Sequence, residues 1–165
     1  KQKTAYEIGK KNFAFVIEEI DAIEYSTLDN IPKKERYSKD GTITPAFKII
    51  IDEVNKKGEI KLIRNIDLTG GCDASKYLDK RTYINMTDCL DKYKDYWDTC
   101  DVLLIEQQMD FGRKKSNPMA NKLGHHCYSY FSINYRDNKK IIEYPAYHKT
   151  QVLGAPKKFG KIEKL

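Results

Sequence analysis

Two glutamates at strand positions are the residues of this sequence best suited to chemistry. Glu7 lies inside the segment Ala5–Gly9, and Glu106 directly follows the apolar run Val102–Ile105. A carboxylate in an apolar strand is costly unless it is paired, hydrogen-bonded or bound to a cation. Carboxylates are hard oxygen ligands of the kind that Mg²⁺ takes, together with water and phosphate oxygens. On neighbouring parallel strands, the pair could hold metal ions that activate water in phosphodiester hydrolysis. The alternative is that both glutamates lie at strand edges in contact with solvent.

The positive charge of the chain is concentrated in its last third. The 165 residues carry a net charge of +6, and residues 107–165 contain 12 Lys and Arg against 4 Asp and Glu. Such a surface favours polyanions, because neutralising phosphates releases condensed counterions. The basic loop Arg113-Lys114-Lys115 is the first candidate for contacts with a nucleic-acid backbone, which position DNA without reading its sequence. Further candidates for the same contacts are Lys10, Lys11, Lys122, Lys149, Lys157 and Lys158.

Two other interpretations of the charge remain open. The lysines could form an ordinary solvated surface, or the chain could be a Lys-rich protein-interaction domain with no nucleic-acid role. The salt dependence of DNA binding distinguishes these interpretations. If the chain binds phosphates, log K should fall with log salt with a slope of ~0.9 per neutralised phosphate.

The sequence predicts neither secretion nor membrane insertion. No run approaches the ~18–20 apolar residues of a membrane span, and the first residues lack the apolar core of a signal peptide. The four cysteines are Cys72, Cys89, Cys100 and Cys127. None forms a C-x-x-C pair, so we expect reduced thiols in an intracellular, reducing compartment. A zinc site of Cys127 with His125 and His126 is the alternative, but adjacent ligands on one helix point in different directions.

Hydrophobic periodicity predicts a mixed sheet with helices on its faces. We expect strands at Thr4–Ile8, Phe13–Ile20, Phe47–Val54, Glu59–Asp67, Val102–Ile105 and Lys139–Tyr144. The strand 102–105 reads as a central parallel strand buried on both faces. The strands 47–54 and 59–67 are expected to form a hairpin around residues 55–58. The polar segment 21–45 is interpreted as a surface insertion.

Two helices are expected between the later strands. Cys89, Leu90, Tyr93, Trp97 and Cys100 recur at helical spacing, with N-caps offered by residues 85–88. The second helix follows Asn117-Pro118, an N-cap and a first-turn proline, and extends to about Phe131. Strand-helix-strand crossovers would place the carboxyl ends of the central strands beside the crevice where open α/β sheets bind ligands.

Two motifs resemble the viral Holliday junction resolvases of the poxvirus and giant-virus type, in the RuvC-like branch of the ribonuclease H-like superfamily. The segment Tyr6–Ala14 is similar to the opening motif D-I-G-x-K-N-x-A of that family. The segment Leu103–Met109 is similar to the second acidic strand, an apolar run that ends in Glu-x-Gln. The resemblance implies a ribonuclease H-like α/β fold, with a mixed five-stranded sheet in a single nuclease domain over residues 1–165.

The resemblance also implies an activity. A chain of this family is a homodimeric endonuclease that resolves four-way (Holliday) DNA junctions with Mg²⁺, or Mn²⁺ as the alternative ion, acting in DNA recombination at a viral replication site in the host cell. Glu7 and Glu106 would then be the catalytic metal ligands. The helix 119–131 is the expected dimer interface.

Two departures from the family pattern support an alternative function. The family has Asp where this chain has Glu7, and a shift of ~1 Å in a catalytic group can cost ~10²-fold in rate. The acidic pair of the family's final helix has no counterpart before Leu165, so the chain is expected to be C-terminally truncated. The alternative function is therefore a branched-DNA-binding module of the same fold with an incomplete catalytic site.

Overall fold

The computed structural model describes residues 2–39, 41–71, 78–107 and 117–145. The chain divides into two compact units. The first contains the chain up to Glu19 together with Glu59–Pro145, and the second has Ile20–Gly58 as its described part. No helix within the described residues combines the length and the apolarity needed to cross a membrane.

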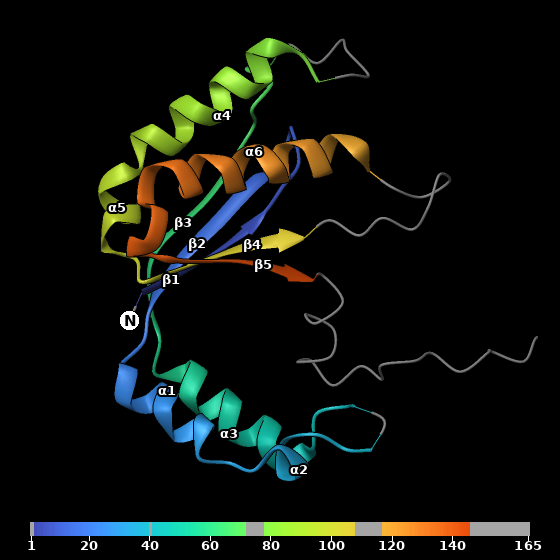
Figure 1. Ribbon diagram of the computed structural model, residues 1–165, viewed down its shortest axis with the longest axis vertical. Coiled ribbons are helices and arrows are strands. Elements are labelled where there is room, and N and C mark those ends of the chain that lie inside the picture. The colour runs from blue at the N-terminus through green and yellow to red at the C-terminus, as the bar shows by residue number, and fades with distance from the viewer. Residues whose placement is uncertain (1, 40, 72–77, 108–116, 146–165) are drawn as a thin grey trace, which may run out of the picture. The chain divides into compact units, whose positions relative to one another are not determined.

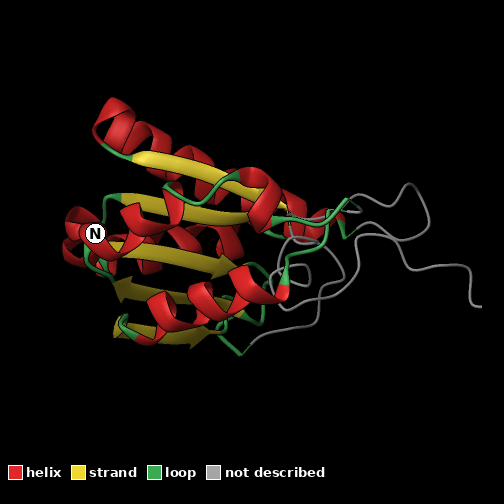
Figure 2. Cartoon of the chain, turned by 90° about the horizontal axis from the view of Figure 1, so that it is seen from below, coloured by secondary structure: helices red, strands yellow, loops and turns green. Residues whose placement is uncertain are grey.

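The first unit is built on a mixed sheet of five strands in the order β3-β2-β1-β4-β5. The strands are β1 (Gln2–Glu7), β2 (Phe13–Glu19), β3 (Glu59–Ile66), β4 (Val102–Gln107) and β5 (Lys140–Pro145). They lie side by side in Figure 2. The pairs β1–β2 and β2–β3 are antiparallel, whereas β1–β4 and β4–β5 are parallel. The mixed α/β class expected from the sequence is confirmed.

Three helices cover one face of this sheet, as Figure 1 shows. They are α4 (Lys80–Lys92), α5 (Lys94–Thr99) and α6 (Pro118–Tyr135). The predicted cap of α6 is confirmed, because Asn117 Oδ1 accepts a hydrogen bond from Ala120 N and Pro118 stands in the first turn. The cap predicted for the preceding helix is wrong. The cap is Asp79, six residues before the first predicted one, and its Oδ1 accepts a hydrogen bond from Thr82 N at 2.8 Å.

The core lies between the sheet and these helices. The alternation in β2 is confirmed, since Phe13, Phe15 and Ile17 are fully buried. The predicted stripe of α6 is confirmed as well, because Leu123, Cys127 and Phe131 are completely buried at a spacing of four residues. In β4, by contrast, Leu103 and Ile105 are buried while Val102 and Leu104 are only half-buried. The expectation of a strand fully buried on both faces is therefore wrong.

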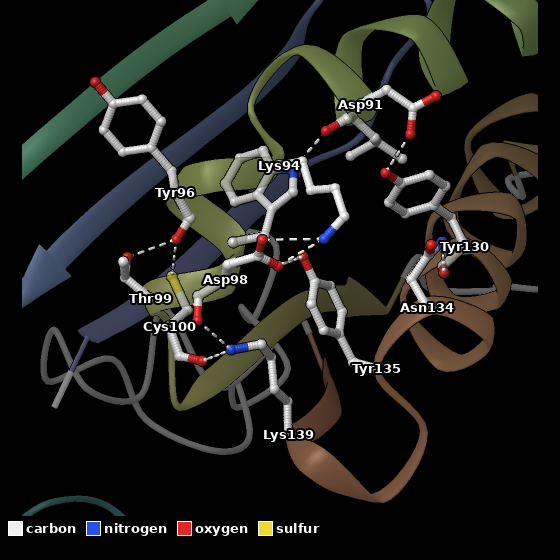
Figure 3. A network of polar contacts seen from close by, with 12 residues as sticks. Asp91, Lys94, Tyr96, Asp98, Thr99, Cys100, Tyr130, Asn134, Tyr135 and Lys139 are labelled. Atoms are coloured by element: carbon white, nitrogen blue, oxygen red, sulfur yellow. Dashed lines mark hydrogen bonds and ion pairs between the residues drawn. The ribbon is translucent and has the colours of Figure 1, made fainter.

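A polar network fixes the end of α5 and the start of β4 (Figure 3). Tyr135 Oη donates to Asp98 Oδ1 at 2.8 Å, and Lys94 Nζ donates to the same carboxylate. Lys139 Nζ donates to the carbonyl oxygens of Asp98 and Cys100. The hydrogen bonds from Lys94 and Tyr135 lower the pKa of Asp98, whereas burial and the contact with Asp98 raise the pKa of Tyr135. The network ties α6 and the residue before β5 to the start of β4.

The second unit is helical and corrects one prediction. Residues 47–54 belong to α3 (Pro45–Lys56) and not to a strand, so the expected hairpin with 59–67 does not form. Thr44 Oγ1 caps this helix by accepting from Phe47 N at 3.2 Å, and Pro45 occupies its first turn. Its β-branched residues suggested a strand, but the buried pair Phe47 and Val54, seven residues apart, marks one helical face.

The segment expected as a surface insertion contains two further helices, α1 (Ala22–Asp29) and α2 (Lys33–Arg36). Asp21 caps α1 through a hydrogen bond from Ile23 N. Within this unit, Lys57 Nζ forms an ion pair with Glu24 at 2.7 Å, and Thr44 Oγ1 donates to the carbonyl oxygen of Glu35. These contacts connect the three helices of the unit.

Candidate functional site

The two candidate carboxylates belong to neighbouring parallel strands. Glu7 is the last residue of β1, and Glu106 is the last but one of β4. The two strands pair in the register Tyr6 with Ile105. Glu7 and Glu106 therefore occupy the next step along the two strands, at their carboxyl ends. On the other side of β4, Glu106 pairs with Tyr144 of β5.

A tight turn after β1 places two of the candidate lysines at the same end of the sheet as Glu7 and Glu106. The residues Gly9 to Asn12 form this turn, closed by a hydrogen bond of 3.1 Å from Gly9 N to Asn12 O. Lys10 is half-buried and Lys11 is exposed. The carbonyl oxygen of Lys10 accepts a hydrogen bond from Leu68 N at 2.8 Å, which fixes the turn against the chain that follows β3.

The turn is also anchored to the helical layer. Ile8, which precedes it, is buried, and its Cδ1 lies 3.8 Å from the place where a Cβ on Gly124 of α6 would be. Asp79 at the start of α4 has a lowered pKa, first because Thr82 donates hydrogen bonds to it and to a smaller extent because of the charge of Lys10. The first turn of the chain is therefore next to the start of α4.

The remaining predicted cations divide into one that is described and six that are not. Lys122 is exposed on α6, one turn after the N-cap. Figure 1 shows that α6 begins on the side where β4 and β5 end. Arg113, Lys114, Lys115, Lys149, Lys157 and Lys158 lie outside the described residues. Of the predicted site residues, Glu7 and Glu106 thus lie near the carboxyl ends of β1 and β4, and Lys10 and Lys11 lie in the turn that follows β1.

The described cysteines belong to the hydrophobic core. The side chains of Cys89, Cys100 and Cys127 are buried, while Cys72 and His148 lie outside the described residues. Burial raises the pKa of the Cys89 thiol to about 11 and also raises that of Cys127. His125 is exposed, while the buried thiol of its neighbour Cys127 faces the core. In the part of the chain that the structure describes, no group of three or more His, Cys, Asp or Glu side chains could hold a metal ion.

One groove was not found from the sequence. A cavity of about 580 Å³ lies between α4 and α6. In its wall, His126 Nε2 is 2.9 Å from Thr87 Oγ1, and the Tyr83 ring stands edge-on at 5.3 Å between ring centroids. Burial lowers the pKa of His126. Tyr83 and Thr87 are four residues apart on α4, which is the only sequence signal for this arrangement.

The expected dimer interface on helix 119–131 stays a prediction. Its apolar and aromatic residues suggested a surface for a second copy. The structure instead packs that face into the core of the same chain, where Ala120, Leu123, Cys127 and Phe131 are buried. Tyr128 and Ile133 of the same helix are exposed, so among its large apolar side chains only these two remain for contacts with a second copy.

Proteins from iridescent viruses are similar to the chain over most of its length, while no family model matches it. Protein 97L of Invertebrate iridescent virus 3 is 30% identical over 160 residues, which cover 92% of this chain and 74% of 97L. Protein 170L of Invertebrate iridescent virus 6 is 30% identical over 166 residues, which cover 93% of this chain and 58% of 170L. The chain thus spans less than two thirds of 170L.

Solved structures of a viral enzyme show a more distant similarity. The crystal structure of the fowlpox virus Holliday junction resolvase matches with a TM-score of 0.43 and 16% identity, covering 88% of this chain and 61% of the resolvase. The same resolvase in complex with Holliday junction DNA matches with a TM-score of 0.45 and 18% identity, covering 88% and 60%.

Proposed function

We propose that this chain, which belongs to the same protein family as protein 97L of Invertebrate iridescent virus 3, is the nuclease domain of a viral endonuclease that resolves four-way DNA junctions. The register of β1 and β4 supports the proposal most. Residues at one register step of neighbouring parallel strands point to the same face of a pleated sheet. The carboxylates of Glu7 and Glu106 would therefore share one patch at the carboxyl ends of the central strands.

The sheet order supports the same assignment. We assign the order β3-β2-β1-β4-β5, with only β2 antiparallel to its neighbours, to the ribonuclease H-like fold. In this assignment β1 and β4 are the central strands of the sheet. Both candidate carboxylates then lie at the edge where open α/β sheets bind their ligands.

The two carboxylates fit a magnesium site by their donor chemistry. Mg²⁺ keeps several waters and usually takes one or two protein carboxylates together with phosphate oxygens. Mn²⁺ accepts the same oxygen ligands. A bound ion would supply charge neutralisation at the scissile phosphate. Glu7 and Glu106 would hold it, while Lys10 and Lys11 of the adjoining turn would position the DNA backbone.

The partners in this proposal follow from the substrate. A four-way junction has two-fold symmetry, so we propose a homodimer that presents two equivalent sites. Arg113, Lys114, Lys115, Lys122, Lys149, Lys157 and Lys158 are proposed as further backbone contacts. The enzyme would act at a viral replication site inside the host cell.

Cleavage of a labelled synthetic four-way junction tests the proposal. We expect paired cuts with Mg²⁺ that are absent with EDTA and absent on a linear duplex of the same sequence. Glu106→Gln should lower the cutting rate by about 100-fold or more, because removing a metal ligand forfeits several kcal/mol and each 1.36 kcal/mol is tenfold in rate. Binding of the junction should be retained. Glu53→Gln, an exposed glutamate of α3, is the matched control and should cut normally. Full activity of Glu106→Gln would refute the proposal.

A second function is favoured by one observation. Glu7 stands where the family motif has an aspartate, and a longer side chain would displace the carboxylate from the position that the metal site needs. The chain would then be a branched-DNA-binding module that does not cut. The same experiment distinguishes the two, because tight junction binding without Mg²⁺-dependent cuts is expected only of the binding module.

A further inference from the structure

The groove between α4 and α6 has no part in the proposed cleavage chemistry. The two helices lie side by side on one face of the sheet (Figure 1). The groove has a volume of about 580 Å³, which is within the range of sites that bind small organic molecules. Two rings, two aliphatic side chains, a hydroxyl and a carboxylate are among the groups that line it, from Tyr83, His126, Leu78, Ile84, Thr87 and Asp88.

The two rings of the lining form a corner. The Tyr83 ring and the His126 imidazole have centroids 5.3 Å apart and planes at 71° to each other. Burial lowers the pKa of His126 below its ordinary value, so the imidazole is uncharged at neutral pH. A planar group that stacks on one of these rings would meet the other with its edge, and aromatic groups favour both arrangements. The corner therefore suits a flat, uncharged ring.

A chain of hydrogen bonds holds the imidazole in place. Thr87 Oγ1 donates to the carbonyl oxygen of Tyr83 at 3.1 Å and lies 2.9 Å from His126 Nε2. A hydroxyl has one proton to donate. Because the carbonyl of Tyr83 takes that proton, His126 Nε2 must carry a hydrogen and donate it to Thr87. The ring is thus oriented before a ligand binds, which reduces the entropy that binding costs.

The charged residues of the lining distinguish between ligands. Asp79 and Asp88 are exposed acids, so an anionic group is disfavoured inside the groove. Asp79 Oδ1 already accepts two hydrogen bonds from Thr82 as the N-cap of α4. Asp88 is therefore the better placed acid to accept from a ligand. Amino groups of adenine, cytosine and guanine are donors of the kind that a carboxylate accepts, whereas thymine has no amino group.

One end of the groove is close to the turn that follows β1. Asp79 has a lowered pKa, first because Thr82 donates hydrogen bonds to it and further because of the charge of Lys10. The proposed function assigns contacts with the DNA backbone to Lys10 and Lys11. A base that leaves the helical stack beside those contacts would therefore lie near the groove.

We propose that the groove between α4 and α6 binds one unstacked nucleobase of the bound DNA, with the base ring against Tyr83 and His126 and its amino group toward Asp88. Extruding a base costs least where its pairing or stacking is already disturbed, as at the crossover of a four-way junction. Leu78 and Ile84 supply apolar contacts. The groove thus selects bases that carry an amino group over thymine.

The base site rests on the proposed function in one respect, because DNA is the source of the base. The two can nevertheless fail separately, since free nucleotides test the groove with neither a junction nor a metal ion. Junction cleavage by a chain whose groove binds no nucleotide would keep the nuclease and overturn the base site. Nucleotide binding by a chain that does not cut would keep the base site and lose the nuclease.

The first measurement is an NMR titration of the chain in EDTA with deoxycytidine monophosphate. We expect millimolar nucleotide to shift the signals of the Tyr83 and His126 rings, and deoxyribose 5-phosphate to leave them in place. Thymidine monophosphate, a pyrimidine with the same sugar phosphate, should bind about threefold more weakly or worse, since it cannot donate an amino hydrogen bond. Asp88→Ala should remove this preference. Ring signals that do not move, or that move equally with arginine amide, would overturn the proposal.

Variants of the ring provide the second measurement. Tyr83→Ala should weaken binding of deoxycytidine monophosphate about tenfold, as expected for a lost base–aromatic stack, and Tyr83→Phe should restore most of the affinity. Tyr128→Ala is the matched control, because Tyr128 is an exposed tyrosine of α6. Equal losses in Tyr83→Ala and Tyr128→Ala would contradict the site. Circular dichroism checks that each variant folds, and the comparison of the two nucleotides on the native chain needs no variant.

A duplex with one unpaired cytidine tests whether DNA supplies the base. It should bind the native chain more tightly than the fully paired duplex does, and Tyr83→Ala should abolish the difference. Fluorescence anisotropy in EDTA measures both affinities. Equal affinity of the native chain for the two duplexes would show that the groove does not take a base from DNA.

Discussion

Glu7 and Glu106 each lie one residue beyond the pairing of β1 with β4 at Tyr6 and Ile105. Because the strands are parallel, both glutamates lie near the carboxyl ends of their strands. The register places them at the same position along the two strand axes. Neighbouring strands in a sheet are about 4.8 Å apart. This spacing is short enough for two carboxylates to bind the same ions, and it underlies the first prediction.

Glu7→Gln should lower Mg²⁺-dependent cleavage of a four-way junction about as much as Glu106→Gln does. Residues that act as one unit are strongly non-additive, so the double variant should be little slower than either single variant. Single-turnover cleavage rates of the three variants measure this. Rate losses that multiply in the double variant would show that the two glutamates act independently.

Lys10 and Lys11 should contribute to DNA affinity through phosphate contacts. Replacing both by Gln should reduce the slope of log K against log salt by about 0.9 for each phosphate contact that is lost. The measurement is fluorescence anisotropy of a labelled junction at several salt concentrations. Lys33→Gln with Lys34→Gln, in the exposed helix α2, removes the same charge elsewhere and serves as the control. Equal slopes for the two double variants would exclude a local role for the turn.

His126 should make the stability of the chain fall in mild acid. Burial lowers its pKa below the ordinary value of 6.5, so the unfolded chain binds the proton more readily than the folded chain. This contribution to stability is complete above pH 6.5 and is lost as the pH falls through the lowered pKa. Urea unfolding between pH 7.5 and 5 should therefore show a decreasing free energy of unfolding.

Two variants isolate this effect. His126→Gln should reduce the slope of the free energy of unfolding against pH, because glutamine does not titrate. The reduction should correspond to less than one bound proton. Ser129→Ala, at an exposed and non-titrating position of the same helix, should leave the slope of the native chain unchanged. A slope unaffected by His126→Gln would assign the pH dependence to other groups.

Arg136→Gly should stabilise the fold. Within the described residues, Arg136 is the one non-glycine residue with positive φ, at φ 44° and ψ −123°, just after α6. Such a conformation costs a residue with a Cβ about 1–3 kcal/mol, whereas glycine adopts it freely but loses about 0.5–1 kcal/mol of chain entropy. We expect a net gain of about 1 kcal/mol in the free energy of unfolding. Arg136→Ala removes the same charge without relieving the backbone and should show no gain in the same denaturant titration.

Several elements could be predicted from the sequence because their signals are local. The alternation of Phe13, Phe15 and Ile17 needs only the two-residue period of a strand, and the buried stripe of α6 needs only the helical period. Asn117 and Pro118 predict the start of α6. The asparagine side chain can accept a hydrogen bond from a backbone N–H of the first turn, and proline is favoured in that turn because its missing N–H would have no partner in the helix. The turn at residues 9–12 is likewise determined by residues within four positions of one another.

The tertiary structure decided what depends on residues far apart in the chain. The β-branched run in α3 favours a strand by local propensity, whereas the cap Thr44, the first-turn Pro45 and the buried pair Phe47 and Val54 favour the helix that forms. The sequence does not tell which apolar residues of α6 face the core, and only packing against the sheet shows that Leu123, Cys127 and Phe131 are buried while Ile133 is exposed. The register of β1 with β4 joins residues almost one hundred positions apart. The sequence determined that two glutamates lie near the carboxyl ends of strands. Only the pairing of those strands made them neighbours, because register is set by packing across the whole sheet.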